Sequence, residues 1–402
     1  MAHIADNLSA RLSLGFSCIG HSYSHLFAPI FYVAALSLEQ ELALSHGEVV
    51  ALIVGGNVLF GFGAPLAGWL GDKWSSTGMM SVFFLGTGTG MILTGFGSSP
   101  MYIGMALALT GLFSSIYHPV GIAWLVRHAV SRGMALGING IFGSVGPGLA
   151  AITAGVLIQQ FSWRAAFIAP GVILVLTGIA FFWLVARGAI VESRVDRKRE
   201  EPASRSDMMR AFMVLAVTMM CTGIIYQATQ PALPKVFSEK LGELTDGGVL
   251  GISMFVAIVY FAAGAMQIVA GRLADKYPLK YVYMIAFTLQ VPFLAIAGSL
   301  SGASLLAVAM IMVSVNSGAL PAENSLVARY APSKWRGLAF GLKFILAFGV
   351  SGLGVLLEGK LYDYTGGFYW LFIVLACVAA VAAMAGMLLP NERPQSTPAP
   401  AE

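Results

Sequence analysis

Two charged side chains stand inside long apolar runs of the sequence, where a charge is costly and usually functional. Glu323 lies six residues before Arg329, about 9 Å along a helix, and we expect it to be the only acidic residue well inside such a run. A carboxyl group desolvated there could bind and release protons, and the alternative is a permanent ion pair with a basic neighbour. Glu323 is therefore our candidate for proton coupling.

Lys343 is the second charge of this kind. It lies seven residues after Arg336, about 10 Å into its apolar run if that run is helical. An ammonium group at this depth reaches back to the membrane edge, pairs with an acid such as Glu323, or faces a polar cavity. In the last arrangement it would attract a carboxylate or phosphonate, so we predict that Lys343 binds an anionic substrate.

Three histidines lie inside apolar runs as well. His118 comes nine residues before Arg127, about 13 Å by helical rise, and is predicted to face a cavity near mid-membrane, where it contacts substrate or relays protons. Pro119 lacks a backbone donor, so we expect a helix irregularity here, and the His118 ring could instead satisfy the freed carbonyl. His21 and His25 are four residues apart, a spacing that could share a metal ion. We expect no metal enzyme, and prefer His21 in the cavity and His25 in helix packing.

Polar side chains also gather in two later apolar runs. One holds a tyrosine and two glutamines just before Pro231, and the other holds an asparagine before Glu323. Because buried polar groups in a membrane tend to line a functional path, we expect these to contact substrate too. They are Tyr226, Gln227, Gln230 and Asn316.

The composition defines the elements that must position these residues. Of the 402 residues, 57% are hydrophobic and only 10% are charged, with a mean hydropathy of +0.80, whereas soluble domains carry about 25% charged residues. A membrane span takes about 20 apolar residues, so the chain accommodates twelve. We place the spans at 12–36, 48–71, 77–97, 100–126, 133–160, 164–186, 210–235, 247–270, 279–299, 302–328, 337–360 and 367–389.

Other features exclude several classes of protein. The net charge of +4 comes from basic residues spread over membrane-edge loops, so no nucleic-acid partner is expected. The three cysteines lie in apolar runs and suggest no disulfide framework. The sequence contains no phosphate-binding loop and no paired catalytic carboxylates, so we expect neither an enzyme nor a cofactor. With both termini in the cytoplasm, 18 Lys and Arg residues fall on the inner side and four on the outer side, which the positive-inside rule favours.

A motif repeats halfway along the chain. The sequence from Gly68 to Lys73 reads Gly-Trp-Leu-Gly-Asp-Lys, and the sequence from Gly271 to Lys276 reads Gly-Arg-Leu-Ala-Asp-Lys, 203 residues later. A repeat at this period predicts two homologous membrane bundles. Its aspartates and the arginines that recur near it are predicted to latch a cytoplasmic gate, with Asp72 near the arginines of the eleventh span and Asp275 near those of the fifth. The predicted gate residues are Asp72, Asp275, Arg127, Arg132, Arg329 and Arg336.

This repeated loop resembles the signature between the second and third helices of the major facilitator superfamily. The stretch Ser-Ser-Ile-Tyr-His-Pro at 114–119, with the Gly-rich 133–137 that follows, resembles the fosmidomycin-resistance-type branch. The resemblance implies that spans one, four, seven and ten line a central cavity. A lysine in span eleven also occurs in the oxalate/formate antiporters of the same superfamily, which parallels Lys343.

We therefore predict an all-α membrane protein of twelve helices in two pseudo-symmetric six-helix bundles, 1–187 and 209–390, with a linker at 188–208 and a disordered tail at 391–402. The predicted function is secondary active transport of a small organic anion or amphiphile across the inner membrane, with proton-coupled export first. Proton-coupled uptake or anion exchange is the alternative, and a sensor or scaffold without flux is a third hypothesis. The expected partners are the substrate, protons and the lipid bilayer, and we expect a monomer.

Overall fold

The computed structural model describes residues 2–128, 132–191, 205–245, 248–331 and 336–391. Within these ranges eleven helices are long and apolar enough to cross a membrane, and the pair α1 and α2 supplies the first span. The prediction of an all-α membrane fold is confirmed. The predicted linker at 188–208 and tail at 391–402 fall mostly outside the described residues.

The N-terminal half, residues 2–191, holds the first six spans. It comprises α1 (Ala2–Ser24), α2 (Phe27–Leu42), α3 (His46–Ala51), α4 (Val54–Lys73), α5 (Ser76–Gly95), α6 (Pro100–Ser114), the π-helical turn η1 (Tyr117–Gly121), α7 (Ile122–His128), α8 (Arg132–Gln160) and α9 (Trp163–Ala186).

The C-terminal half, residues 205–391, holds the other six. It comprises α10 (Arg205–Lys240), α11 (Gly242–Thr245), α12 (Val249–Lys276), α13 (Leu279–Ala297), α14 (Gly302–Tyr330), α15 (Arg336–Phe344), the π-helical turn η3 (Ile345–Val350), α16 (Leu353–Thr365) and α17 (Tyr369–Met387).

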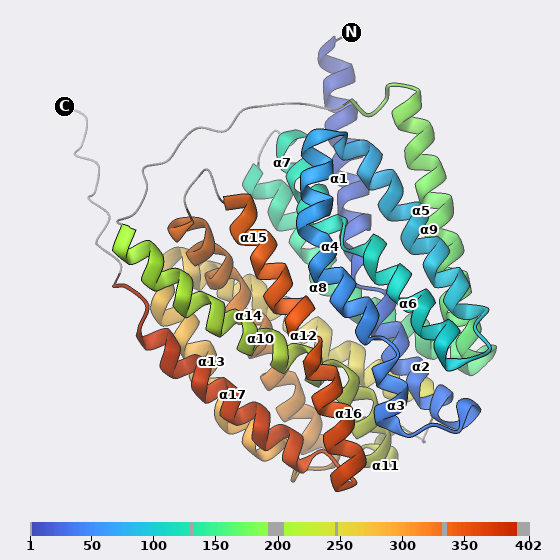
Figure 1. Cartoon of the computed structure of the whole chain (residues 1–402), viewed down its shortest axis with the longest axis vertical. Coiled ribbons are helices and arrows are strands. Elements are labelled where there is room, and N and C mark those ends of the chain that lie inside the picture. Colours follow the sequence, from blue (N-terminus) through green and yellow to red (C-terminus); the bar gives the residue numbers. More distant parts are fainter. Residues whose placement is uncertain (1, 129–131, 192–204, 246–247, 332–335, 392–402) are drawn as a thin grey trace.

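The two halves lie side by side (Figure 1). On one flank of the interface α8 packs against α12, and on the other α4 packs against η3 and α15. The halves also meet where α3 contacts α16, at the lower end of the view, and where α2 contacts α10. A buried apolar core contains residues of both halves, among them Ile30, Leu107, Phe237 and Leu371. The two halves therefore touch along several of their spans.

Serine caps start several of the spans. The side chains of Ser75, Ser99 and Ser162 accept hydrogen bonds from backbone N–H groups three residues later, and Pro100 takes the first helical position after Ser99. At the start of α3, Ser45 and Glu48 form a reciprocal capping box. These caps satisfy donors that a short loop would otherwise leave unpaired.

The first span breaks at His25 and Leu26, which no sequence signal predicted. The backbone N–H groups of these residues bond to carbonyls three residues earlier, at Ser22 and Tyr23. The carbonyl of His21 thus loses its usual helical partner, and the Ser24 hydroxyl donates to it instead at 2.8 Å. The serine makes the break tolerable inside a membrane, where an unpaired carbonyl is costly.

The fourth span follows prediction more closely. Pro119 cannot donate a backbone hydrogen bond, and the helix passes through η1 at this point, as expected. The eleventh span contains a second π-helical turn, η3, which begins two residues after Lys343 and contains no proline. Two of the spans with candidate site residues are therefore irregular at or beside those residues.

Candidate functional site

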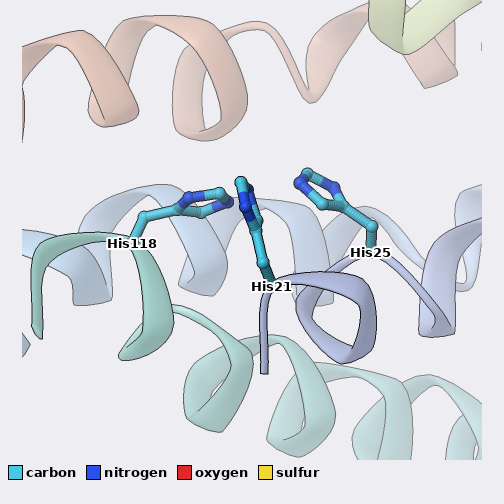
Figure 2. Close-up of side chains that lie close together, drawn as sticks. All are labelled: His21, His25 and His118. Atoms are coloured by element: carbon cyan, nitrogen blue, oxygen red, sulfur yellow. The ribbon is translucent and has the colours of Figure 1, made fainter. Parts of the chain in front are cut away.

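The break in the first span and the turn η1 bring three histidines together. The ring centroids of His21 and His25 are 5.4 Å apart, those of His21 and His118 are 5.3 Å apart, and those of His25 and His118 are 5.2 Å apart. All three rings are half-buried, and Figure 2 shows them projecting into one space from α1, the turn that follows it, and η1. The sequence predicted His21 and His118 in a shared cavity but left His25 to helix packing.

A hydrogen-bond network holds the His21 ring. Its Nδ1 lies 2.8 Å from the carbonyl oxygen of Asn139, and its face stacks on Tyr117 with centroids 5.1 Å apart. The Asn139 amide donates to the Tyr117 hydroxyl at 2.8 Å, and that hydroxyl lies 2.7 Å from the carbonyl of Ser17, to which it donates. Asn139 was missed in the sequence, although a lone amide in an apolar run was a signal for it.

His118 connects the two halves. Its ring stacks on Phe344 of α15 with centroids 5.1 Å apart, and the edge of Phe60 of α4 lies beside it. The Nε2 atom is buried and has no hydrogen-bond partner among the described residues. A buried nitrogen without a partner is unusual and calls for a ligand, water or proton at this position.

Lys343 forms a buried ion pair with Glu323. The Lys343 Nζ atom lies 2.9 Å from Glu323 Oε1 and also donates to the side-chain oxygen of Asn324. The Tyr283 hydroxyl donates to the other carboxylate oxygen of Glu323 at 2.6 Å. Lys343 is 6% exposed and Glu323 is 1% exposed, so neither charge reaches solvent in this arrangement. Of the alternatives for Lys343, the structure holds the pairing with Glu323.

The polar residues of the seventh span line a small cavity between the halves. Tyr226, Gln227 and Gln230 face His25 and Asn57 across it. The Gln230 amide donates to the Tyr226 hydroxyl at 2.6 Å. Asn316 instead lines a neighbouring small cavity of the C-terminal half, where its wall includes Tyr226, Gln230, Tyr260 and Gln290. The predicted site residues thus form three groups: the histidines, these cavities and the buried ion pair.

The predicted gate is described in part. Arg127 donates to Asp72 with Nη2 3.2 Å from Oδ1, which joins α7 to the end of α4 within the N-terminal half. We had expected the arginines near the eleventh span beside Asp72, but the side chain of Arg336 lies outside the described residues. The side chain of Arg132 does too. Asp275 is exposed at the end of α12, and Arg329 is half-buried in the last turn of α14. The gate therefore stays a prediction.

A second charge network, which sequence reasoning missed, joins the halves at the start of α3. This is the other end of the second span from Asp72. His46 lies with Nδ1 2.7 Å from Glu39 and with Nε2 2.8 Å from Glu358. Lys235 pairs with the other oxygen of Glu39. We call these four residues the α3–α16 latch. Glu358 is fully buried inside the eleventh span, so the expectation that Glu323 is the only acidic residue well inside a span was wrong. Glu358 lies close to the predicted end of the span. The sequence therefore did not show that it is buried, because its burial depends on the packing of α3.

Removing one carboxylate should open the α3–α16 latch. Glu39→Gln keeps the shape of the side chain but loses the charged hydrogen bonds to His46 and Lys235, each worth about 1.5–3 kcal/mol. We expect the population of molecules in which α3 and α16 are separated to rise at least about tenfold. The measurement is the distance distribution between spin labels at Gln40 and Tyr364, both exposed, with Cys377, the exposed cysteine, replaced by serine.

Glu41→Gln is the matched control. Glu41 is on the same helix, but its partners Trp163 and Arg164 belong to the same half, so its loss should leave the label distance unchanged. An equal response of the two variants would contradict the latch.

Comparisons with known proteins agree with this architecture. The model of the Major Facilitator Superfamily matches residues 16–243 and 215–402. The chain is 23% identical over 377 residues to a fosmidomycin resistance protein of Escherichia coli K12, covering 90% of this chain and 89% of the relative. It is 23% identical over 405 residues to a gallate transporter of Pseudomonas putida, covering 91% of this chain and 88% of the relative.

Among solved structures, a bacterial homologue of the human lysosomal transporter Spinster, in an inward-facing and unoccupied conformation, has a TM-score of 0.76. The sequence identity is 13%, and the similarity covers 96% of this chain and 99% of that one, which establishes the fold. The resemblance seen in the repeated Asp-Lys loop is thereby confirmed. With a family model that matches nearly the whole sequence, this chain belongs to the Major Facilitator Superfamily.

Proposed function

We propose that the protein transports a small organic anion together with a proton, with Lys343 as the anion contact and Glu323 as the proton carrier. The observation that carries this proposal is the buried ion pair of Lys343 and Glu323, 2.9 Å apart. Each charge neutralises the other, so the pair can stay buried away from water when no substrate is bound.

The chemistry of the pair favours binding of both species at once. An anion that contacts Lys343 displaces Glu323, which is then a buried carboxylate without a cation. Such a group takes up a proton, because burial penalises its charged form. Anion and proton thus enter together and leave together, which is the coupling of a symporter. The sequence led us to expect export first, and the ion pair moves our proposal to proton-coupled uptake.

The irregular spans supply the route to this pair. Phe344, next to Lys343, stacks on His118 of the opposite half, and the cavity around Gln227 and His25 lies between the same halves. Rocking of the two halves would break the contact of Phe344 with His118 and would expose Lys343 to that cavity. Gln227, whose side-chain nitrogen is buried without a partner among the described residues, would then contact the substrate.

The names of two relatives support an anionic substrate. One is a gallate transporter, and gallate is a carboxylate. Another is a probable sulfoacetate transporter of Cupriavidus necator, 21% identical over 94% of this chain. The fosmidomycin resistance protein supports export as the second candidate function. The direction of coupling separates the two, because an exporter would exchange the anion for a proton.

The test is transport in proteoliposomes with a pH gradient and labelled gallate as the probe. We expect wild type to accumulate gallate when the outside is acidic and to ignore the uncharged methyl ester. Lys343→Gln should lower gallate transport at least about a hundredfold because it removes the cation that holds the anion, whereas Lys343→Arg should keep part of the rate.

Lys360→Gln is the control, since Lys360 is an exposed lysine later in the same span and its loss should leave the rate unchanged. Full gallate transport by Lys343→Gln would overturn the role of Lys343. Gallate driven out by an inward proton gradient would favour the exporter. No flux of any anionic probe, with gallate still bound by purified protein, would favour the sensor hypothesis.

A further inference from the structure

The three histidines point to a second kind of ligand, separate from the organic anion. We propose that His21, His25 and His118 bind a transition-metal ion of the zinc class. The ligating ring nitrogens of the three residues all lie within 4.8 Å of one another, and Figure 2 shows the three rings turned toward one space. Three imidazoles leave a fourth coordination position for water or an anion.

The spacing suits such an ion after a small contraction. Zinc–nitrogen bonds of about 2.0–2.1 Å place tetrahedral ligand atoms roughly 3.3 Å apart. The rings must therefore close by up to about 1.5 Å, measured against the 4.8 Å limit. Since the rings are half-buried and come from the end of α1, a turn and η1, side-chain rotation and the irregular backbone can supply this movement.

The tautomer of His21 is set for metal binding. Its Nδ1 faces the carbonyl oxygen of Asn139 at 2.8 Å, and a carbonyl only accepts, so Nδ1 carries the proton. The lone pair is then on Nε2, on the far side of the ring from Asn139. A carbonyl behind a ligating histidine is the usual outer support of such sites, because it fixes the ring and raises its basicity.

The position of this ring also requires a glycine on α8. A Cβ atom at Gly143 would lie 2.3 Å from Cε1 and 2.4 Å from Nε2 of His21, so any side chain there would occupy the place of the ligand atom. His118 adds an independent sign, since its Nε2 is buried without a partner among the described residues. The Nε2 atoms of His21 and His118 can thus both act as ligands, and the His21 ring is already held in place by Asn139.

The donor set selects the metal. Imidazole nitrogens suit zinc, copper and nickel, whereas magnesium and calcium require oxygen ligands. The three neutral imidazole rings supply no negative charge to balance the positive charge of the metal ion, so other charges near the site matter. The nearby ammonium of Lys343 is already paired with Glu323 at 2.9 Å, so it repels the ion less than a free cation would. We therefore take Zn²⁺ as the probe ion and Co²⁺ as its spectroscopic substitute.

The experiment is equilibrium binding to the full chain, without a polyhistidine tag, in lipid nanodiscs. Zn²⁺ is titrated against a chromogenic chelator, and Co²⁺ is followed by its visible absorption. We expect one Zn²⁺ per chain, the intense Co²⁺ bands of a four-coordinate site, and no competition from Mg²⁺. Zn²⁺ should also raise the Tm of the protein, because it binds the folded state.

The variants His21→Gln, His25→Gln and His118→Gln should each weaken Zn²⁺ binding at least about tenfold, and Gly143→Ala should do so with all three ligands retained. His128→Gln is the matched control, because the ring of His128 lies 2.8 Å from the carbonyl of Trp124, away from the cluster. The Tm without zinc identifies any variant that fails to fold, and the remaining variants then decide. Unchanged Zn²⁺ binding in folded His21→Gln and His118→Gln would overturn the site. Because binding is measured without transport, its failure leaves the proposed function standing, and the reverse also holds.

Discussion

Replacing Glu323 by glutamine is expected to lower the free energy of unfolding by about 3–5 kcal/mol, the largest loss that we predict for a single side chain. The reason is the ammonium of Lys343, which is 6% exposed and would lose its anion. Breaking a buried ion pair by removal of one partner costs this amount, because the remaining charge stays desolvated. The measurement is thermal unfolding in one detergent, with wild type alongside.

The second replacement Lys343→Gln should restore most of this stability, because it removes the buried ammonium that Glu323→Gln leaves without an anion. The double variant should fold but fail to bind gallate. Tyr283→Phe gives a graded comparison, since it removes the donor to Glu323 and the contact of the same hydroxyl with Thr218 but leaves both charges in place, and it should cost about 1.5–3 kcal/mol. If the Glu323→Gln variant were as stable as wild type, the prediction would be wrong, and the ammonium of Lys343 would have to contact water or another anion in that variant.

Replacing Gly61 by alanine is expected to reduce transport at least about tenfold by forcing the halves apart on one flank. A Cβ atom at Gly61 would lie 2.2 Å from the backbone nitrogen and 2.5 Å from the Cα of Gly349, and 2.9 Å from the carbonyl oxygen of Phe344. All three are backbone atoms of the eleventh span, so no rotamer change relieves the overlap. The helix α4 must move away from η3.

Gly55→Ala is the matched control on the same helix. A Cβ atom there would meet Ala108 at 3.5 Å, which is ordinary contact. We expect Gly55→Ala to transport as wild type does, and Gly61→Ala to favour conformations with α4 and η3 separated, seen as a longer distance between labels at Leu66 and Leu353. Equal transport by the two alanine variants would mean that this contact is absent from the transport cycle.

The sequence predicted best what depends on local composition and on repetition. Long apolar runs predicted the spans, and the repeated Asp72 and Asp275 loops predicted two related bundles. Pro119 predicted an irregular helix, because a missing donor acts within one turn. The pairing of Glu323 with Lys343 was one of the alternatives, since two opposite charges in neighbouring spans have few other partners.

What sequence reasoning missed depends on contacts between distant segments. His46 and Glu358 are 312 positions apart, and only the packing of α3 on α16 makes them neighbours. His25 joins the cluster because the first span breaks there, and the hydroxyl of Ser24 that makes the break tolerable gives no pattern of its own. The repeat was also misleading in detail, since Pro119 lies in a π-helical turn while Pro321 stays within the regular helix α14.

The turns η1 and η3 have a mechanical consequence for the two spans that contain them. A π-helical turn holds one residue more than an α-helical turn, and one residue corresponds to about 100° of rotation. The part of a span before such a turn is therefore out of phase with the part after it, and a change in the turn twists one part against the other. Arg127 could stay bound to Asp72 while His118 rotates, and Lys343 could leave Glu323 while α16 stays fixed to α3. A transporter built in this way can reorient a binding residue by torsion within a helix, with both ends of that helix held in place.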